Sequence, residues 1–152
     1  MIASGDAEPV DPDVEERPGV LIGGWDALAA VTIGGIAGSL LRYEAGVHWR
    51  TAPGAFPWTT FWINVIGCAG IGVLLVLVSD VWPQRRLVRP LLATGFLGGF
   101  TTFSAYGVDS QRLFRTGHAG TAWANLFVTL VSALVAVTVS ALVTRRLLRS
   151  RG

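Results

Sequence analysis

Apolar residues dominate four stretches of the chain, and short polar segments separate these stretches. Each apolar stretch is 17 to 22 residues long, close to the ~20 residues that a helix needs to cross the hydrocarbon of a bilayer. The pattern therefore predicts an all-α membrane protein with four transmembrane helices. The predicted helices lie at 26–42, 60–81, 89–108 and 122–143.

The polar connections carry the residues that usually mark turns and membrane interfaces. TAPGAFPW at 51–58 holds two prolines, SDVWPQRR at 79–86 holds Pro83 before two arginines, and FRTGHAGTAW at 114–123 holds two glycines. Proline and glycine favour turns. Tryptophan is enriched where a membrane protein meets the interface. The connections therefore predict chain reversals at the two membrane surfaces.

Composition agrees with a membrane location. Of the 152 residues, 51% are hydrophobic and 14% are charged, and the mean hydropathy is +0.53, above the range of an ordinary soluble domain. All twelve basic residues are arginines that cluster between the apolar stretches, so no nucleic-acid surface is predicted. The single Cys68 lies among small apolar residues and is interpreted as a packing residue.

The two ends of the chain differ from its middle. Residues 1–24 contain six of the ten acidic residues and three prolines, which predicts a disordered acidic tail. The start is acidic and lacks a basic segment before an apolar one, so no signal peptide is expected. Residues 25–146 are predicted to form a four-helix transmembrane subunit, and residues 147–152 a basic C-terminal tail.

Glycines recur at spacings that bring them to one side of a helix. Gly34 and Gly38 form a GxxxG pair in the first stretch, and Gly67, Gly70 and Gly72 supply small positions in the second. Helices in lipid associate through close packing, which small residues permit. Because four thin helices enclose little by themselves, we also expect the chain to form an oligomer.

The stretch GGFTTFSAYG at 98–107 interrupts the third apolar segment. Glycines destabilise a helix, and threonine and serine hydroxyls compete for backbone hydrogen bonds, so the third helix is predicted to unwind at its middle. Freed carbonyls of Gly98 and Thr101 would suit a small cation. The ring edges of Phe103 and Tyr106 would suit an anion. The alternative is that the glycines only permit close helix crossing and the rings face lipid.

Polar residues inside the apolar stretches are candidates for function, because polarity is costly in a membrane. Asn64 either joins helices or offers amide donors to a permeating anion. Arg42 either reaches the membrane interface or draws anions toward a pore mouth. In the fourth stretch Asn125, Thr129 and Ser132 fall on one helical face and predict a polar stripe.

Three motifs in a fixed order resemble the Fluc (CrcB-like) family of fluoride channels. They are GGIAGSLLRY at 34–43, WINVIGCAGIG at 62–72 and GFLGGFTTFSAYG at 95–107, and the likeness covers about residues 27–145. The resemblance implies an antiparallel, dual-topology-type dimer with two fluoride pores. It also implies a structural sodium ion, the one expected cofactor, at the dimer interface.

The resemblance also implies a role for individual residues. The backbone carbonyls of Gly98 and Thr101 match the sodium ligands, and Arg42 matches an arginine at the vestibule. Tyr106 stands where the family has the second of two phenylalanines, and its added hydroxyl alters the expected anion contact. The implied fluoride pore residues are Asn64, Thr102, Phe103, Ser104, Tyr106 and Thr129.

The implied function is passive export of cytoplasmic fluoride across the cell inner (plasma) membrane, which protects the cell from fluoride toxicity. Hydrogen fluoride enters uncharged and dissociates, and the inside-negative potential then drives the anion outward. The chain has no phosphate-binding GxxxxGK[ST] loop, and its two histidines are isolated in connections. We therefore predict that the protein is not an enzyme.

Two other classes of protein remain as alternatives. A small multidrug exporter shares the four short helices but requires an acidic residue within the membrane. The four acidic residues beyond the tail lie at or near the ends of the apolar stretches. A membrane subunit that only binds partners is the second alternative, and a fluoride flux measurement distinguishes it from a channel.

The distribution of arginines bears on the second subunit. If the N-terminus lies on side one, that side holds eight arginines and the other side four, which favours both termini in the cytoplasm. Such a bias suggests a heterodimer with an oppositely inserted paralogous subunit. Omitting Arg42 and the four arginines nearest the C-terminus leaves four against three, so a homodimer remains the expectation for the purified chain.

Overall fold

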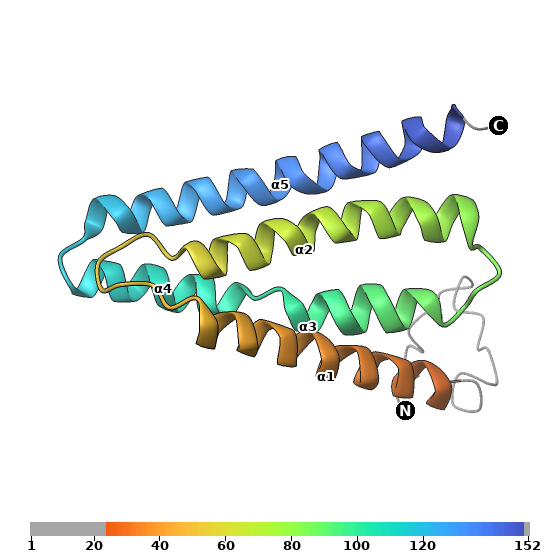
Figure 1. The fold of residues 1–152 in the computed structure, drawn as a ribbon, viewed down its shortest axis with the longest axis horizontal. Coiled ribbons are helices and arrows are strands. Elements are labelled where there is room, and N and C mark those ends of the chain that lie inside the picture. Colours follow the sequence, from red (N-terminus) through yellow and green to blue (C-terminus); the bar gives the residue numbers. More distant parts are fainter. Residues whose placement is uncertain (1–23, 151–152) are drawn as a thin grey trace, which may run out of the picture.

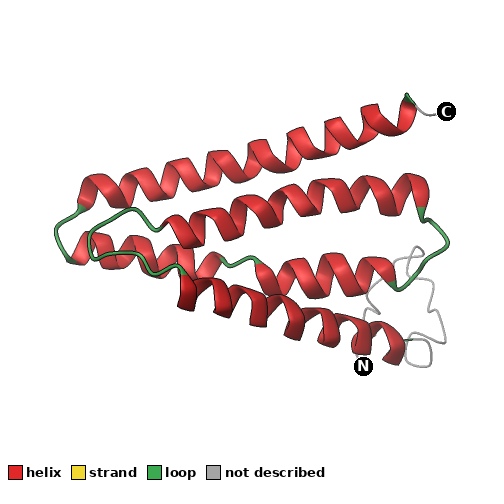
Figure 2. Ribbon diagram, viewed as in Figure 1, coloured by secondary structure: helices red, strands yellow, loops and turns green. Residues whose placement is uncertain are grey.

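The computed structural model describes residues 24–150, and within this range every regular element is a helix (Figures 1 and 2). The all-α prediction is thus confirmed for the described residues. The predicted acidic tail, apart from Gly24, and residues 151–152 lie outside that range. The helices are α1 Trp25–His48, α2 Trp58–Val76, the π-helices η1 Leu77–Val81 and η2 Arg89–Leu97, α3 Gly98–Phe100, α4 Phe103–Arg115 and α5 Ala119–Arg149.

Most of the helices extend beyond the predicted apolar stretches. Helix α1 continues to His48, and α5 continues to Arg149, so residues 147–149 of the predicted basic tail are helical. Hydropathy marks only the part of a helix that suits hydrocarbon. Arginine and glutamate are themselves good helix formers, and the helices therefore continue into their polar flanks.

Among the described residues, three helical segments are long and apolar enough to cross a membrane. They are Trp58–Val81, Arg89–Arg115 and Ala119–Arg149, with hydropathies of 2.4, 1.2 and 2.5. Helix α1 has 24 residues but does not join this group, because Asp26, Arg42, Glu44 and its glycines lower its hydropathy. The prediction of a fourth span at 26–42 is not confirmed by this measure.

The helices pair in an interleaved order. Helix α1 packs along η2 and α3, whereas α2 packs along α5, which also contacts α4 (Figure 1). The first and third segments of the chain thus form one pair, and the second and last segments form another. Helix α2 also contacts η2 and so joins the two pairs.

Glycines allow the α1 pair to approach backbone to backbone. A Cβ atom on Gly38 would collide with the carbonyl oxygen of Phe96, and one on Gly99 would lie 2.5 Å from the carbonyl oxygen of Gly35. The predicted GxxxG pair Gly34 and Gly38 is buried in this contact, which confirms its role in close packing. This contact lies within one chain and uses that face of α1.

The helical conformation is interrupted between α3 and α4, at Thr101 and Thr102. Both residues are extended, with φ/ψ of −73°/158° and −150°/120°. Gly98, by contrast, keeps helical angles of −64°/−35°. The sequence interpretation placed the unwinding on the glycines as well as the threonines, and for the glycines it is wrong. Gly99 serves the close contact with α1, while side-chain hydrogen bonds hold the two threonines extended.

Candidate functional site

The side chain of Asn64 on α2 holds the interruption in place. Its Nδ2 donates to the carbonyl oxygen of Thr102 at 3.0 Å, and the Thr102 N–H donates to Asn64 Oδ1 at 2.8 Å. An amide group carries two hydrogens on nitrogen, and this pair uses one of them. Asn64 therefore joins helices and keeps one donor for another acceptor, so the two interpretations of this residue are compatible.

The interruption releases the two carbonyls that the sequence singles out. In a helix, the Gly98 carbonyl would accept from the Thr102 N–H, but that N–H donates to Asn64. The Thr101 carbonyl would accept from the Ala105 N–H, which instead donates to Thr102 Oγ1 at 3.1 Å. The N–H groups that would pair with these two carbonyls in a helix thus donate to side chains instead. Among residues 24–150 no cluster of three or more His, Cys, Asp or Glu side chains could hold a metal.

The carbonyl oxygen of Gly99, beside the interruption, accepts hydrogen bonds from side chains of another helix. The Gly99 oxygen accepts from Arg42 Nε at 3.0 Å and from Ser39 Oγ at 3.4 Å, both on α1. The sequence predicted a vestibule position for Arg42. The structure shows its half-buried side chain against the interrupted backbone.

A cavity of about 230 Å³ lies beside the interruption and gathers most of the predicted pore residues. The ring centroids of Phe103 and Tyr106 lie 5.6 Å apart. The Phe103 residue is 84% exposed. Ser104 does not line the cavity, although its Oγ lies 3.2 Å from Thr102 Oγ1. The lining residues are Asn64, Cys68, Thr101, Thr102, Phe103, Tyr106, Thr129, Leu130 and Ala133.

The hydroxyl of Tyr106 is directed at α5. It donates to the carbonyl oxygen of Leu126 at 2.7 Å. The ring of Tyr106 still lines the cavity. The hydroxyl that distinguishes Tyr106 from the family's phenylalanine therefore has a partner in the protein.

A buried polar network connects α4 to α5. Asn125 Nδ2 donates to Ser110 Oγ at 2.8 Å, and Thr129 Oγ1 donates to Asn125 Oδ1 at 3.0 Å. These three residues are at most 4% exposed. Of the predicted stripe, Asn125 and Thr129 face α4, whereas the sequence interpretation missed Ser110. Ser110 lies four residues after Tyr106, and its Oγ donates to the Tyr106 carbonyl oxygen. This spacing places both residues on one face of the helix and could have indicated that Ser110 belongs to the network.

The position of Asp109 also differs from the sequence prediction, which placed it near the end of an apolar stretch. It belongs to α4, six residues before the end of that helix, and not to a span edge. Its Oδ2 accepts from Thr60 Oγ1 at 2.6 Å. The structure thus places one carboxylate within the membrane-capable segment Arg89–Arg115.

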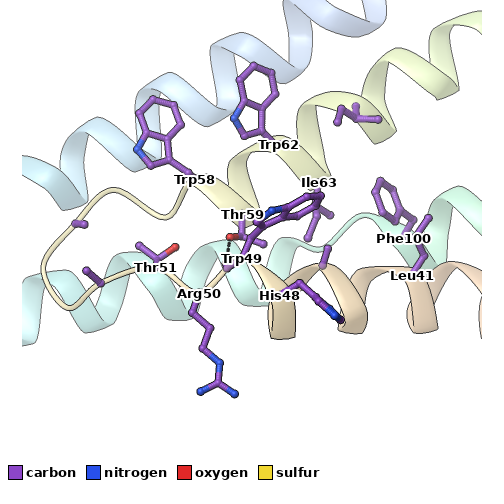
Figure 3. Close-up of a pocket in the computed structure, with 14 residues that line it drawn as sticks. Leu41, His48, Trp49, Arg50, Thr51, Trp58, Thr59, Trp62, Ile63 and Phe100 are labelled. Atoms are coloured by element: carbon purple, nitrogen blue, oxygen red, sulfur yellow. Dashed lines mark hydrogen bonds between the residues drawn. The ribbon is translucent and has the colours of Figure 1, made fainter.

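A larger cavity, of about 710 Å³, lies between the end of α1 and the start of α2 (Figure 3). Three tryptophans line it, Trp49, Trp58 and Trp62, while the Arg50 side chain points away from it. Phe100, which precedes the interruption, reaches its lining. None of the predicted pore residues does.

Comparison with known proteins adds relatives along most of the chain. Fluoride-specific ion channel FluC 2 of Streptomyces avermitilis is 57% identical over 103 residues, covering 68% of this chain and 65% of that protein. FluC 1 of Streptomyces coelicolor is 48% identical over 132 residues, covering 84% and 86%. FluC 2 of Nocardia farcinica is 42% identical over 137 residues, covering 90% and 89%. The chain thus spans just under two thirds of the first relative and most of the other two.

A family model described as "CrcB-like protein, Camphor Resistance (CrcB)" matches residues 29–141. The match includes all three motifs and every residue of the cavity beside the interruption. The chain belongs to the CrcB-like family.

Proposed function

We propose that this chain is a subunit of a passive, fluoride-selective channel that exports cytoplasmic fluoride through the plasma membrane. The names of its relatives support the choice of ion. The observation that carries the proposal is the cavity, where Asn64, Phe103, Tyr106 and Thr129 meet beside an interrupted, membrane-capable helix. Irregular backbone at membrane depth is stable where it is buried in protein or lines a polar path.

The cavity offers an anion several weak, uncharged donors. Asn64 keeps one amide hydrogen. Helix α4 begins at Phe103, and the first N–H groups of a helix have no acceptor within it and carry partial positive charge. The ring edges of Phe103 and Tyr106 add further positive potential. Uncharged donors bind an anion without trapping it, which suits conduction.

A sodium ion fits the carbonyls of Gly98 and Thr101. Both carbonyls have lost their helical donors to side chains, and unwound backbone oxygens are the ligands that transport proteins offer to sodium. One chain supplies two such oxygens, fewer than a hard cation requires. A second, antiparallel copy across a two-fold axis would supply the remainder, and the bound ion would join the subunits.

The proposed topology has four spans, with α1 as the first and η2, α3 and α4 together as an interrupted third. The 24 residues of α1 suffice in length, and its glycine face is shielded by η2. The second subunit is another copy or a paralogue. Relatives numbered FluC 2 and FluC 3 from one Streptomyces species show that such pairs of genes occur.

Ion flux from liposomes tests the function. Purified protein is reconstituted into vesicles loaded with potassium fluoride or potassium chloride, and efflux is started with a potassium ionophore. We expect rapid loss of fluoride and negligible loss of chloride. Equal fluxes of both ions, or none above protein-free vesicles, would refute the proposal. Uptake of a cationic drug driven by a proton gradient would instead favour an exporter with Asp109 as the proton carrier.

A further inference from the structure

We infer that Arg42 is a positioning residue: by binding the Gly99 carbonyl, it determines which backbone oxygens of the interruption remain available to a cation. This inference rests on the proposed function and concerns the cation site beside the pore. It gives Arg42 a task different from attracting anions at a vestibule.

The carbonyls of Gly98, Gly99 and Thr101 differ in whether a new hydrogen-bond donor replaces the lost helical one. Those of Gly98 and Thr101 lost their helical donors to Asn64 and Thr102. The Gly99 carbonyl would pair with the Phe103 N–H in a helix, and the extended Thr101 and Thr102 remove that partner too. Only this carbonyl regains donors from another helix, namely Arg42 Nε and Ser39 Oγ.

The charge on Arg42 makes its hydrogen bond selective. A guanidinium is always protonated and cannot accept, so an oxygen bound to it faces a positive charge. A cation at the same oxygen would be repelled. The Gly99 oxygen is therefore excluded from any cation site, and the peptide plane that carries it is fixed between the two carbonyls that are released.

The position of Arg42 follows from the glycine contact. Gly35 lies against Gly99, and Gly38 lies against the Phe96 carbonyl. The next residues of α1 toward its C-terminus, Ser39 and Arg42, are three apart and lie on one side of the helix. The close approach of α1 thus brings both side chains to the Gly99 oxygen.

The test is the sodium dependence of thermal unfolding of the full-length protein in detergent, with N-methylglucamine replacing sodium at constant ionic strength. We expect sodium to raise the unfolding temperature of the wild type. Arg42→Gln should raise the sodium concentration for half of this effect about tenfold, as loss of a charge-assisted hydrogen bond implies. For Arg42→Lys this sodium concentration should lie between those of the wild type and Arg42→Gln. Ser39→Ala should raise the same concentration by about twofold, because its hydrogen bond is longer and weaker.

Arg50→Gln is the matched control, because Arg50 is an exposed arginine just after the C-terminal end of α1, and its side chain points away from the other side chains drawn in Figure 3. It should leave the sodium curve unchanged. A wild-type curve independent of sodium, or an unchanged curve for Arg42→Gln, would overturn the inference. If Arg42→Gln does not fold, unchanged curves for both Arg42→Lys and Ser39→Ala would overturn it. Absence of wild-type fluoride flux would separately refute the channel.

Discussion

The side-chain amide of Asn64 and the peptide group of Thr102 bind each other through two hydrogen bonds, of 3.0 and 2.8 Å. This pair joins α2 to the interruption and removes the N–H that would otherwise close the helix over Gly98. One side chain thereby stabilises the irregular backbone and prevents it from becoming regular.

Asn64→Ala should weaken the fold and stop the flux. Loss of both bonds leaves the peptide group of the buried Thr102 without partners, at a cost of about 2 kcal/mol in the free energy of unfolding. We expect fluoride efflux to fall at least about tenfold, since the cavity loses its amide donor as well. Cys68→Ala is the control, because Cys68 lines the same cavity, and it should keep most of the flux. Asn64→Ala with wild-type flux would contradict the role given to this amide.

Tyr106→Phe should leave fluoride flux within about twofold of the wild type. The hydroxyl donates to Leu126 and is held away from a permeating ion, so its loss costs about 1 kcal/mol of stability and little conduction. Tyr106→Leu, which removes the aromatic ring edge, should reduce the flux strongly. A several-fold rise in flux for Tyr106→Phe would show instead that the hydroxyl restricts the pore.

Thr129→Val should destabilise the protein by about 1–3 kcal/mol, because Asn125 Oδ1 would remain buried without its donor. Thr138→Val is matched to it, since Thr138 is exposed on the same helix and bonds only to the carbonyl of Leu134. Denaturant unfolding in micelles compares the two variants. Equal stabilities would contradict the importance of the buried network.

Gly38→Ala should prevent α1 from packing on η2, since the added methyl group meets the backbone of Phe96. We expect poor yield of folded protein or a loss of several kcal/mol in stability. Gly46→Ala is the control on the same helix. Nothing lies within 4 Å of its added methyl, and it should be neutral or stabilising by about 0.5–1 kcal/mol. Equal behaviour of the two variants would refute the close contact.

Topology can be tested by cysteine labelling. In a Cys68→Ala background, a cysteine added after Arg151 is labelled in intact cells and in lysed cells. Cytoplasmic termini in all copies, as the arginine count favours, predict labelling only after lysis. Substantial labelling from outside would establish dual topology and exclude an obligate heterodimer.

The sequence was a good guide to what lies inside the helices and a poorer one to where they are interrupted. Asn64, Phe103 and Thr129 were selected for their polarity or spacing, and the structure brings them to one cavity. Local propensity could not show that Gly99 stays helical, because its neighbour Gly35 lies 64 residues away in the chain. The contacts of Arg42 and Ser110 also depend on helix pairs that periodicity does not reveal.

The interleaved pairing of α1 with η2 and of α2 with α5 makes each half of the chain incomplete. A cut in the connection between Val81 and Arg89 would separate α1 from η2 and α2 from α5. Helices α1 and α2 would stay in one fragment, while η2, α4 and α5 would be in the other. Neither fragment contains both surfaces of the glycine contact. Two such fragments, made together in one cell, would therefore restore the subunit only by assembling with each other, which makes this chain suited to a split-protein reporter of encounters within the membrane.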